Sequence, residues 1–156
     1  MKIGILDYNA CNIKSVYNAV YRLGYNPHVI ENYSEIKEQD KLIIPGVGSA
    51  FKTVDYLKKK NLFDSINEFI DKSKPTMGIC LGLQLLCKNL YEGGSTHGFN
   101  KFDCDVIPLR KEITNVGWVD VDIEPSISIS MNLKTKSSFY FCHSYFLKFN
   151  KIDEKR

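Results

Sequence analysis

The residue with the strongest chemical signal is Cys80, which stands between two glycines in the segment MGICLGLQLLC. The spacing Gly78-x-Cys80-x-Gly82 is the cysteine form of a nucleophile elbow, a strained turn that connects a strand to a helix. The positive end of the helix dipole favours a thiolate at this position, and the N–H of Leu81 would face an oxyanion. The spacing alone leaves a second interpretation open, in which Cys80 is a small buried core residue.

A second glycine turn favours the nucleophile. The segment IIPGVGSAF places Gly46, Val47 and Gly48 at the end of a neighbouring apolar strand, where backbone N–H groups could complete an oxyanion hole. One such turn is often only a tight connection, but two of them on adjacent strand ends indicate a site. Cys87 follows Cys80 by seven residues on the same predicted helix face, and we expect it to lie in the core.

Apolar strands that alternate with amphipathic helices predict the fold of the first half. Predicted strands cover residues 2–7, 26–30, 41–46 and 76–80, and predicted helices cover residues 13–24 and 61–73. Such strands pair in parallel, because a parallel connection needs a crossover. We therefore expect a three-layer, doubly wound, flavodoxin-like α/β sheet with its ligand site at the carboxyl ends of the strands, where Cys80 lies.

After Gly98 the pattern changes to a period of two. Alternating polar and apolar residues fill the segments 102–110, 116–125, 126–132 and 137–149, with no helical period between them. This half is expected to consist mostly of antiparallel strands. Because no repeat, low-complexity stretch or linker divides the chain, residues 1–156 are expected to form a single domain.

Composition excludes several classes of protein. The 156 residues are 44% hydrophobic and 25% charged with a net charge of +3, and no segment matches a nucleic-acid-binding motif. No apolar run approaches the roughly 20 residues that span a bilayer, and the five cysteines have no CxxC spacing. We expect a cytoplasmic protein with reduced thiols, without a metal or cofactor, and with neither a nucleic-acid nor a membrane partner.

Five motifs together resemble a known family. They are DYNACNIKS, IPGVGSAF, MGICLGLQLL, VGWVDV and YFCHSYF, and they span nearly the whole chain. In this order they resemble the class I (triad) glutamine amidotransferases, and more closely the glutaminase subunits of imidazole glycerol phosphate synthase from histidine biosynthesis. The resemblance implies that Cys80 attacks the side-chain amide of glutamine, forms a glutamyl thioester and releases ammonia.

The same resemblance implies roles for further residues. Leu81 and the turn Gly46-Val47-Gly48 would stabilise the oxyanion. The glutamine pocket would be lined by Gln84, Glu92, His143, Ser144 and Tyr145. The ammonia would pass to a (β/α)₈-barrel cyclase subunit in a heterodimer, with Asn12, Trp118 and Tyr140 at the interface.

Two departures from the family pattern stand out. The family takes its triad His and Glu from a late Phe-His-Pro-Glu motif, which these residues do not contain, so we expect a C-terminally incomplete domain with little glutaminase activity. Among the three histidines, His28 and His97 are expected to be structural or in loops, and His143 matches a pocket position. Asn115 stands where the synthase subunits carry a histidine. Two alternatives therefore stay open: an amidotransferase subunit for bacterial surface-sugar amination, or a catalytically silent, truncated binding subunit.

Overall fold

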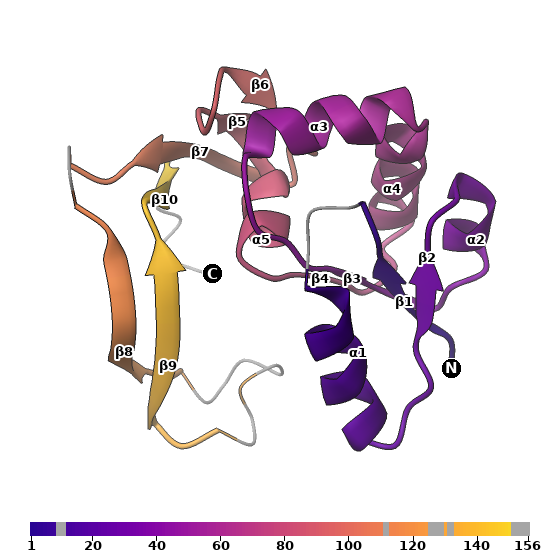
Figure 1. The fold of residues 1–156 in the computed structure, drawn as a ribbon, viewed down its shortest axis with the longest axis horizontal. Helices are drawn as coiled ribbons and strands as arrows, with labels where there is room; N and C mark the ends of the chain where they lie inside the picture. Colours follow the sequence, from indigo (N-terminus) through magenta and orange to yellow (C-terminus); the bar gives the residue numbers. More distant parts are fainter. Residues whose placement is uncertain (9–11, 111–112, 125–129, 131–132, 151–156) are drawn as a thin grey trace. The chain divides into compact units, whose positions relative to one another are not determined.

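The computed structural model describes residues 1–8, 12–110, 113–124, 130 and 133–150 (Figure 1). The chain divides into two units, residues 1–107 with 147–156 and residues 108–146, and each is described by itself. Whether residues 1–156 act as one domain stays a prediction.

A four-stranded parallel sheet forms the centre of the first unit. Its strands are β1 (Ile3–Leu6), β2 (His28–Ile30), β3 (Lys41–Ile44) and β4 (Thr76–Gly78), in the order β2-β1-β3-β4. All four residues of β1 are buried, as is typical of a parallel strand covered on both faces. The predicted doubly wound parallel sheet is confirmed, and each of the four predicted strands is present with boundaries within two residues.

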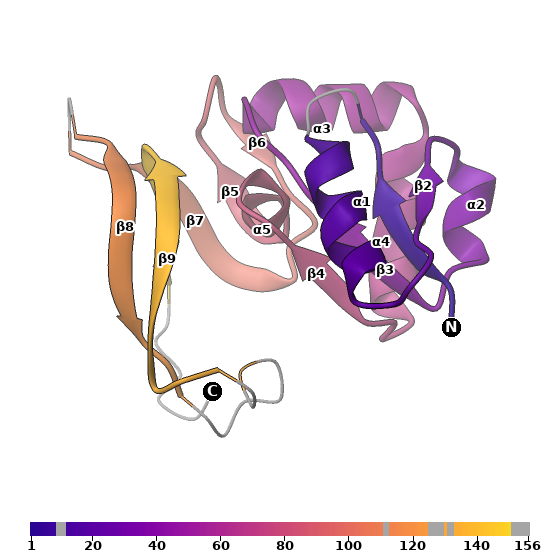
Figure 2. The ribbon, with the colours of Figure 1, turned by 60° about the horizontal axis from the view of Figure 1, so that its bottom comes forward.

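Helices cover both faces of this sheet. They are α1 (Ile13–Arg22), α2 (Tyr33–Lys37), α3 (Ala50–Lys59), α4 (Leu62–Asp71) and α5 (Leu81–Leu85). Figures 1 and 2 show α1 on one side of the sheet and α3 and α4 on the other, so the predicted three layers are present. Val20 of α1 packs with Ile3 and Ile5 of β1 in one core cluster. Within the described ranges, no helix has the length and apolarity to cross a membrane.

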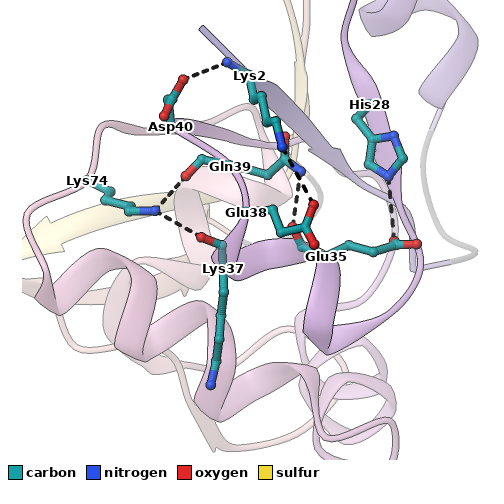
Figure 3. Close-up of polar contacts among 8 residues, drawn as sticks. All are labelled: Lys2, His28, Glu35, Lys37, Glu38, Gln39, Asp40 and Lys74. Atoms are coloured by element: carbon teal, nitrogen blue, oxygen red, sulfur yellow. Dashed lines mark hydrogen bonds and ion pairs between the residues drawn. The ribbon is translucent and has the colours of Figure 1, made fainter.

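Polar contacts connect both ends of the short helix α2 to neighbouring segments of the chain (Figure 3). The Glu35 carboxylate accepts hydrogen bonds from the backbone N–H groups of residues 31 and 32 at the start of the helix, and it lies 3.9 Å from His28 Nε2 on β2. At the other end of α2, Lys74 Nζ donates to the carbonyl oxygens of Lys37 at 3.2 Å and Gln39 at 2.6 Å. Because Lys74 lies just before β4, its bonds to the carbonyls at the end of α2 and just after it also fix the segment that leads into β4.

A second sheet follows α5 in the order β10-β7-β5-β6. Its strands are β5 (Cys87–Leu90), β6 (Thr96–His97), β7 (Phe102–Pro108) and β10 (Tyr145–Phe149). β5 pairs antiparallel with β6 and parallel with β7. In the second unit, β8 (Asn115–Asp122) and β9 (Lys136–His143) form the antiparallel ribbon that period-two alternation predicts. Most of the segment predicted as a strand over 126–132 lies outside the described residues.

The prediction that Cys87 lies on the same helix as Cys80 is wrong. α5 ends at Leu85 and Cys87 begins β5, although its predicted core position is confirmed, since the side chain is 0% exposed. The backbone gives the physical reason. The carbonyls of Leu85 and Cys87 accept hydrogen bonds from Phe99 at 2.7 Å and Asn100 at 3.2 Å, so a distant segment takes acceptors that a longer helix would use.

The junction of β4 and α5 leaves no room for a side chain at Gly82. A Cβ there would overlap the Ile44 carbonyl oxygen at the end of β3. We predict that Gly82→Ala lowers the free energy of unfolding by about 3 kcal/mol, because the backbones of β3 and α5 must move apart. Urea titration followed by circular dichroism measures this loss.

Gly24→Ala is the matched control. Gly24 has φ +86° after the end of α1, and a Cβ added to it would have no other atom within 4 Å, so alanine there costs only about 1 kcal/mol of backbone strain. Equal losses in the two variants would contradict the close approach of α5 to β3.

Candidate active site

Cys80 occupies a strained turn between β4 and α5, two elements that Figure 2 labels. Its backbone has φ 54° and ψ −111°, a conformation that non-glycine residues rarely adopt, and its side chain is exposed. The N–H groups of Leu83 and Gln84 donate to its carbonyl oxygen at 3.0 and 3.1 Å, which begins the helix directly at the cysteine. Such strain costs about 1–3 kcal/mol and concentrates at functional sites.

The two glycines around Cys80 are required by backbone contacts. A Cβ on Gly78 would lie 2.6 Å from the backbone carbonyl carbon of Gly82 and from Cα of Leu83. Together with the overlap at Gly82, this means that strand and helix meet at backbone distance on both sides of the cysteine. The Gly-x-Cys-x-Gly spacing therefore has the steric cause that the sequence predicts for it.

The glycine turn that follows β3 lies beside this elbow. A Cβ on Gly46 would be 2.9 Å from Leu81 Cβ and 3.2 Å from the backbone nitrogen of Gly82. Gly48 has φ +102°, and Val47 between them is exposed. The structure thus brings together the two segments that the sequence nominates for oxyanion binding, although they are more than 30 residues apart in the chain.

Tyr8 holds this turn, a role that the sequence did not predict. The buried hydroxyl of Tyr8 donates to the carbonyl oxygen of Pro45, and a Cβ on Gly46 would run into the same hydroxyl. This bond fixes the orientation of the peptide unit that enters the turn. The signal that could have found it is the place of Tyr8 just after β1, at the carboxyl edge of the sheet where Cys80 also lies.

Glu92 contacts the residues that directly follow the same turn. Its backbone carbonyl accepts hydrogen bonds from Ser49 Oγ and from the Phe51 N–H, both at 3.1 Å. Its carboxyl group accepts a hydrogen bond from the N–H of Ala50, the first residue of α3. Burial raises the pKa of Glu92 above its ordinary value, and the Ala50 bond opposes part of that rise.

Gln84 contributes a buried acceptor one turn into α5. Its side chain is 7% exposed, and within the described residues its Oε1 atom is buried without a hydrogen-bond partner. A buried oxygen without a hydrogen bond lowers the stability of the folded state by roughly 1–3 kcal/mol, so a donor that reaches Oε1 would restore that loss. An ammonium or amide group of a ligand would supply one.

The other predicted pocket and interface residues are found in three places. His143, Ser144 and Tyr145 form the turn between β9 and β10, and Trp118 lies across the ribbon from Tyr140 in the second unit. The Trp118 and Tyr140 rings are 5.7 Å apart, edge to face, and are 73% and 58% exposed. Asn12 caps α1, its side chain accepting from the Ser15 N–H at 3.4 Å.

His28, His97 and Cys87 have structural surroundings. His28 pairs with Glu35, and His97 Nδ1 lies 3.0 Å from Asn89 Oδ1. Burial raises the pKa of the Cys87 thiol far above its ordinary value, and the neighbouring Cys104 thiol raises it further. Cys87 is therefore an inert thiol, whereas Cys80 is exposed. In the part of the chain that the structure describes, no three His, Cys, Asp or Glu side chains gather as metal ligands.

Comparison with known families gives one consistent result. The family described as a CobB/CobQ-like glutamine amidotransferase domain matches residues 2–131. The imidazole glycerol phosphate synthase subunit HisH of Caldanaerobacter subterraneus subsp. tengcongensis is 37% identical over 153 residues, which cover 97% of this chain and 75% of that protein. The HisH subunit of Lactococcus lactis is 36% identical over 146 residues, covering 92% of this chain and 72% of that protein.

Solved structures agree in fold. A crystal structure of a glutamine amidotransferase superposes with a TM-score of 0.71 and 16% identity, covering 97% of this chain and 75% of the other. A glutamine amidotransferase from Thermotoga maritima has a TM-score of 0.64 and 14% identity, covering 96% of this chain and 63% of the other. At these low sequence identities the structural similarity shows the fold alone. It confirms the predicted amidotransferase-like α/β architecture.

Tyr8→Phe tests the support of the glycine turn. The variant removes the donor from the buried Pro45 carbonyl, and we predict a loss of about 1–3 kcal/mol in the free energy of unfolding. Tyr17→Phe is the control, because the Tyr17 hydroxyl makes an exposed bond of 3.3 Å to Asn26 and its loss costs about 0.5 kcal/mol or less. Urea unfolding curves compare the two, and equal losses would refute the role of Tyr8.

Glu92→Gln tests the raised carboxyl pKa through the pH dependence of stability. The pKa of Glu92 is higher in the folded state than in the unfolded state, so the folded state binds more protons. The contribution of Glu92 to the free energy of unfolding is therefore complete below the unfolded pKa, and it is lost as the pH rises through the folded pKa. We predict that Glu92→Gln removes this loss, so the stability of the variant relative to wild type grows between acidic and neutral pH.

Glu68→Gln is the control with the opposite sign. The hydrogen bond from Lys72 lowers the pKa of Glu68, so its contribution is present at neutral pH and disappears as the pH falls. The variant should lose stability relative to wild type between acidic and neutral pH. Urea titrations across this range measure both series, and parallel curves for the two variants would contradict the assigned directions.

Proposed function

This chain belongs to the HisH family of glutamine amidotransferase domains, and from that premise we propose that it is the glutaminase subunit of an imidazole glycerol phosphate synthase. It would hydrolyse glutamine to glutamate and ammonia through a thioester on Cys80. The observation that carries this proposal is the exposed, strained Cys80 beside the Gly46 turn. The HisH relatives favour the histidine pathway over surface-sugar amination.

The first step is attack of the Cys80 sulfur on the side-chain amide carbon of glutamine. A C–S bond forms, and the carbonyl oxygen becomes an oxyanion near the N–H of Leu81 and the N–H groups of the Gly46-Val47-Gly48 turn. Tyr8 and Glu92 support this arrangement, because they fix the entry and exit of the turn. Donors that are already in place lose no free energy to reorganisation as the charge develops.

The tetrahedral intermediate then collapses to the glutamyl thioester. The C–N bond breaks, ammonia leaves with the proton that the thiol gave up, and water later hydrolyses the thioester to glutamate and the free thiol. In the triad family the base is the histidine of a Phe-His-Pro-Glu motif, which residues 1–156 do not contain. His143 stays a proposed pocket residue.

We assign recognition of the substrate to Gln84 and to the other residues that the family resemblance implies for the glutamine pocket. The unpartnered Oε1 atom of Gln84 would accept a hydrogen bond from a nitrogen of the bound glutamine. Glu92, with Ser144 and Tyr145, would complete the pocket. The ammonia would pass to a (β/α)₈-barrel cyclase subunit, and the exposed Trp118 and Tyr140 pair, with Asn12, is proposed for that interface.

Replacement of the nucleophile tests the proposal directly. We predict that Cys80→Ala lowers ammonia release from glutamine, in the complex with the barrel subunit, to the rate measured without protein. Cys142→Ser is the control, since Cys142 is also exposed but lies on β9. A coupled glutamate dehydrogenase assay measures the ammonia.

Two outcomes would contradict the glutaminase. If wild type binds the barrel subunit but releases no ammonia, the chain is the silent binding subunit instead. If Cys80→Ala retains the activity of wild type, the nucleophile lies elsewhere.

A further inference from the structure

The second unit contains a hydrogen-bond chain that the catalytic steps above do not use. Asn115 and His143 lie directly opposite each other on β8 and β9, and the amide nitrogen of Asn115 is 3.0 Å from Nε2 of His143. Nδ1 of the same ring is 2.8 Å from the carbonyl oxygen of Tyr145. The chain therefore runs from β8 through the imidazole to the turn that follows β9.

The partners determine where the ring proton lies. A carbonyl oxygen only accepts hydrogen bonds, so Nδ1 must carry a proton to bond Tyr145. A neutral imidazole has one N–H, so Nε2 is then an acceptor and Asn115 must present its NH₂ group. The opposite orientation of the amide would require a doubly protonated ring. In this structure the NH₂ group of Asn115 faces the ring, which fits an unprotonated Nε2.

Further contacts hold the turn that the ring reaches. The carbonyl oxygen of Ser144 accepts a hydrogen bond from the N–H of Leu109 at 2.8 Å. The Phe141 ring stands edge to face against His143, with centroids 5.8 Å apart. The turn from His143 to Tyr145 is thus fixed by β8, by Leu109 and by its own strand.

We propose that Asn115 is a positioning residue that holds His143 as the Nδ1–H tautomer and, through that ring, fixes the turn that carries Ser144. Because Asn115 occupies the Nε2 lone pair and Nδ1 carries the proton, His143 has no free lone pair with which to act as a base. The link from this turn to glutamine rests on the proposed function, whereas the state of the ring does not.

A second cross-strand pair of an asparagine and a histidine serves as a control. In this pair the amide oxygen, and not the amide nitrogen, faces the imidazole ring. Asn89 and His97 face each other on β5 and β6. The amide nitrogen of Asn89 donates to Asp105 Oδ1 at 2.7 Å, which leaves its oxygen 3.0 Å from His97 Nδ1. Asn89→Ala changes this second pair and leaves Asn115 and His143 intact.

Nitrogen-15 NMR of histidine-labelled protein, above the titration range of histidine, tests the ring state. We expect the wild-type His143 to show a protonated Nδ1 and an unprotonated Nε2. Asn115→Asp offers only acceptors to the ring, so Nε2 should gain a proton while Nδ1 keeps its bond to the Tyr145 carbonyl. Asn89→Ala should leave the His143 signals unchanged. A wild-type ring protonated at Nε2, or an Nε2 that stays unprotonated in Asn115→Asp, would overturn the assignment.

Glutamine kinetics test the link to the pocket. Asn115→Ala should raise the KM for glutamine by about 2- to 10-fold, as expected for the loss of one positioning hydrogen bond, while kcat changes less. An unchanged KM would overturn the link to the pocket. An inactive wild-type protein would instead refute the proposed function, and the NMR result would still decide the role of Asn115.

Discussion

The contact on which the site depends is the approach of α5 to the end of β3 at backbone distance. The Ile44 carbonyl occupies the space that a side chain at residue 82 would need, and the Ile79 N–H donates to that same carbonyl at 2.9 Å. This approach forces the chain to turn sharply after β4, and the strained conformation of Cys80 is its consequence. It also brings Leu81 next to Gly46. The nucleophile and the oxyanion turn therefore share one steric cause.

Two other segments stabilise this arrangement, one before the glycine turn and one after it. Tyr8, which follows β1, bonds the carbonyl before the glycine turn, and Glu92, which follows β5, bonds the first residues after it. Both supports come from residues far from the turn in the sequence. The turn therefore gains its fixed shape only within the folded unit, where the sheet brings these distant residues to it.

Steric requirements of single residues made part of this structure predictable. Glycine at positions 78 and 82 predicts the elbow, because only a close backbone approach requires glycine on both sides of a cysteine. Apolar runs predict the parallel strands, and Gly24 predicts the end of α1. The contacts that were missed join distant residues. Tyr8 meets Pro45, and residues 99–102 take the carbonyls at the end of α5, so that Cys87 enters a strand. No local pattern encodes such partners.

The central claim is that Cys80 is the nucleophile that attacks glutamine, and covalent labelling with a glutamine-derived diazoketone tests it most directly. Peptide mass spectrometry locates the adduct. Cys142 is an internal comparison, because both side chains are exposed. We expect an adduct on Cys80 that excess glutamine suppresses, with Cys142 unmodified. Equal modification of the two cysteines, or labelling of Cys80 that glutamine does not suppress, would contradict the claim.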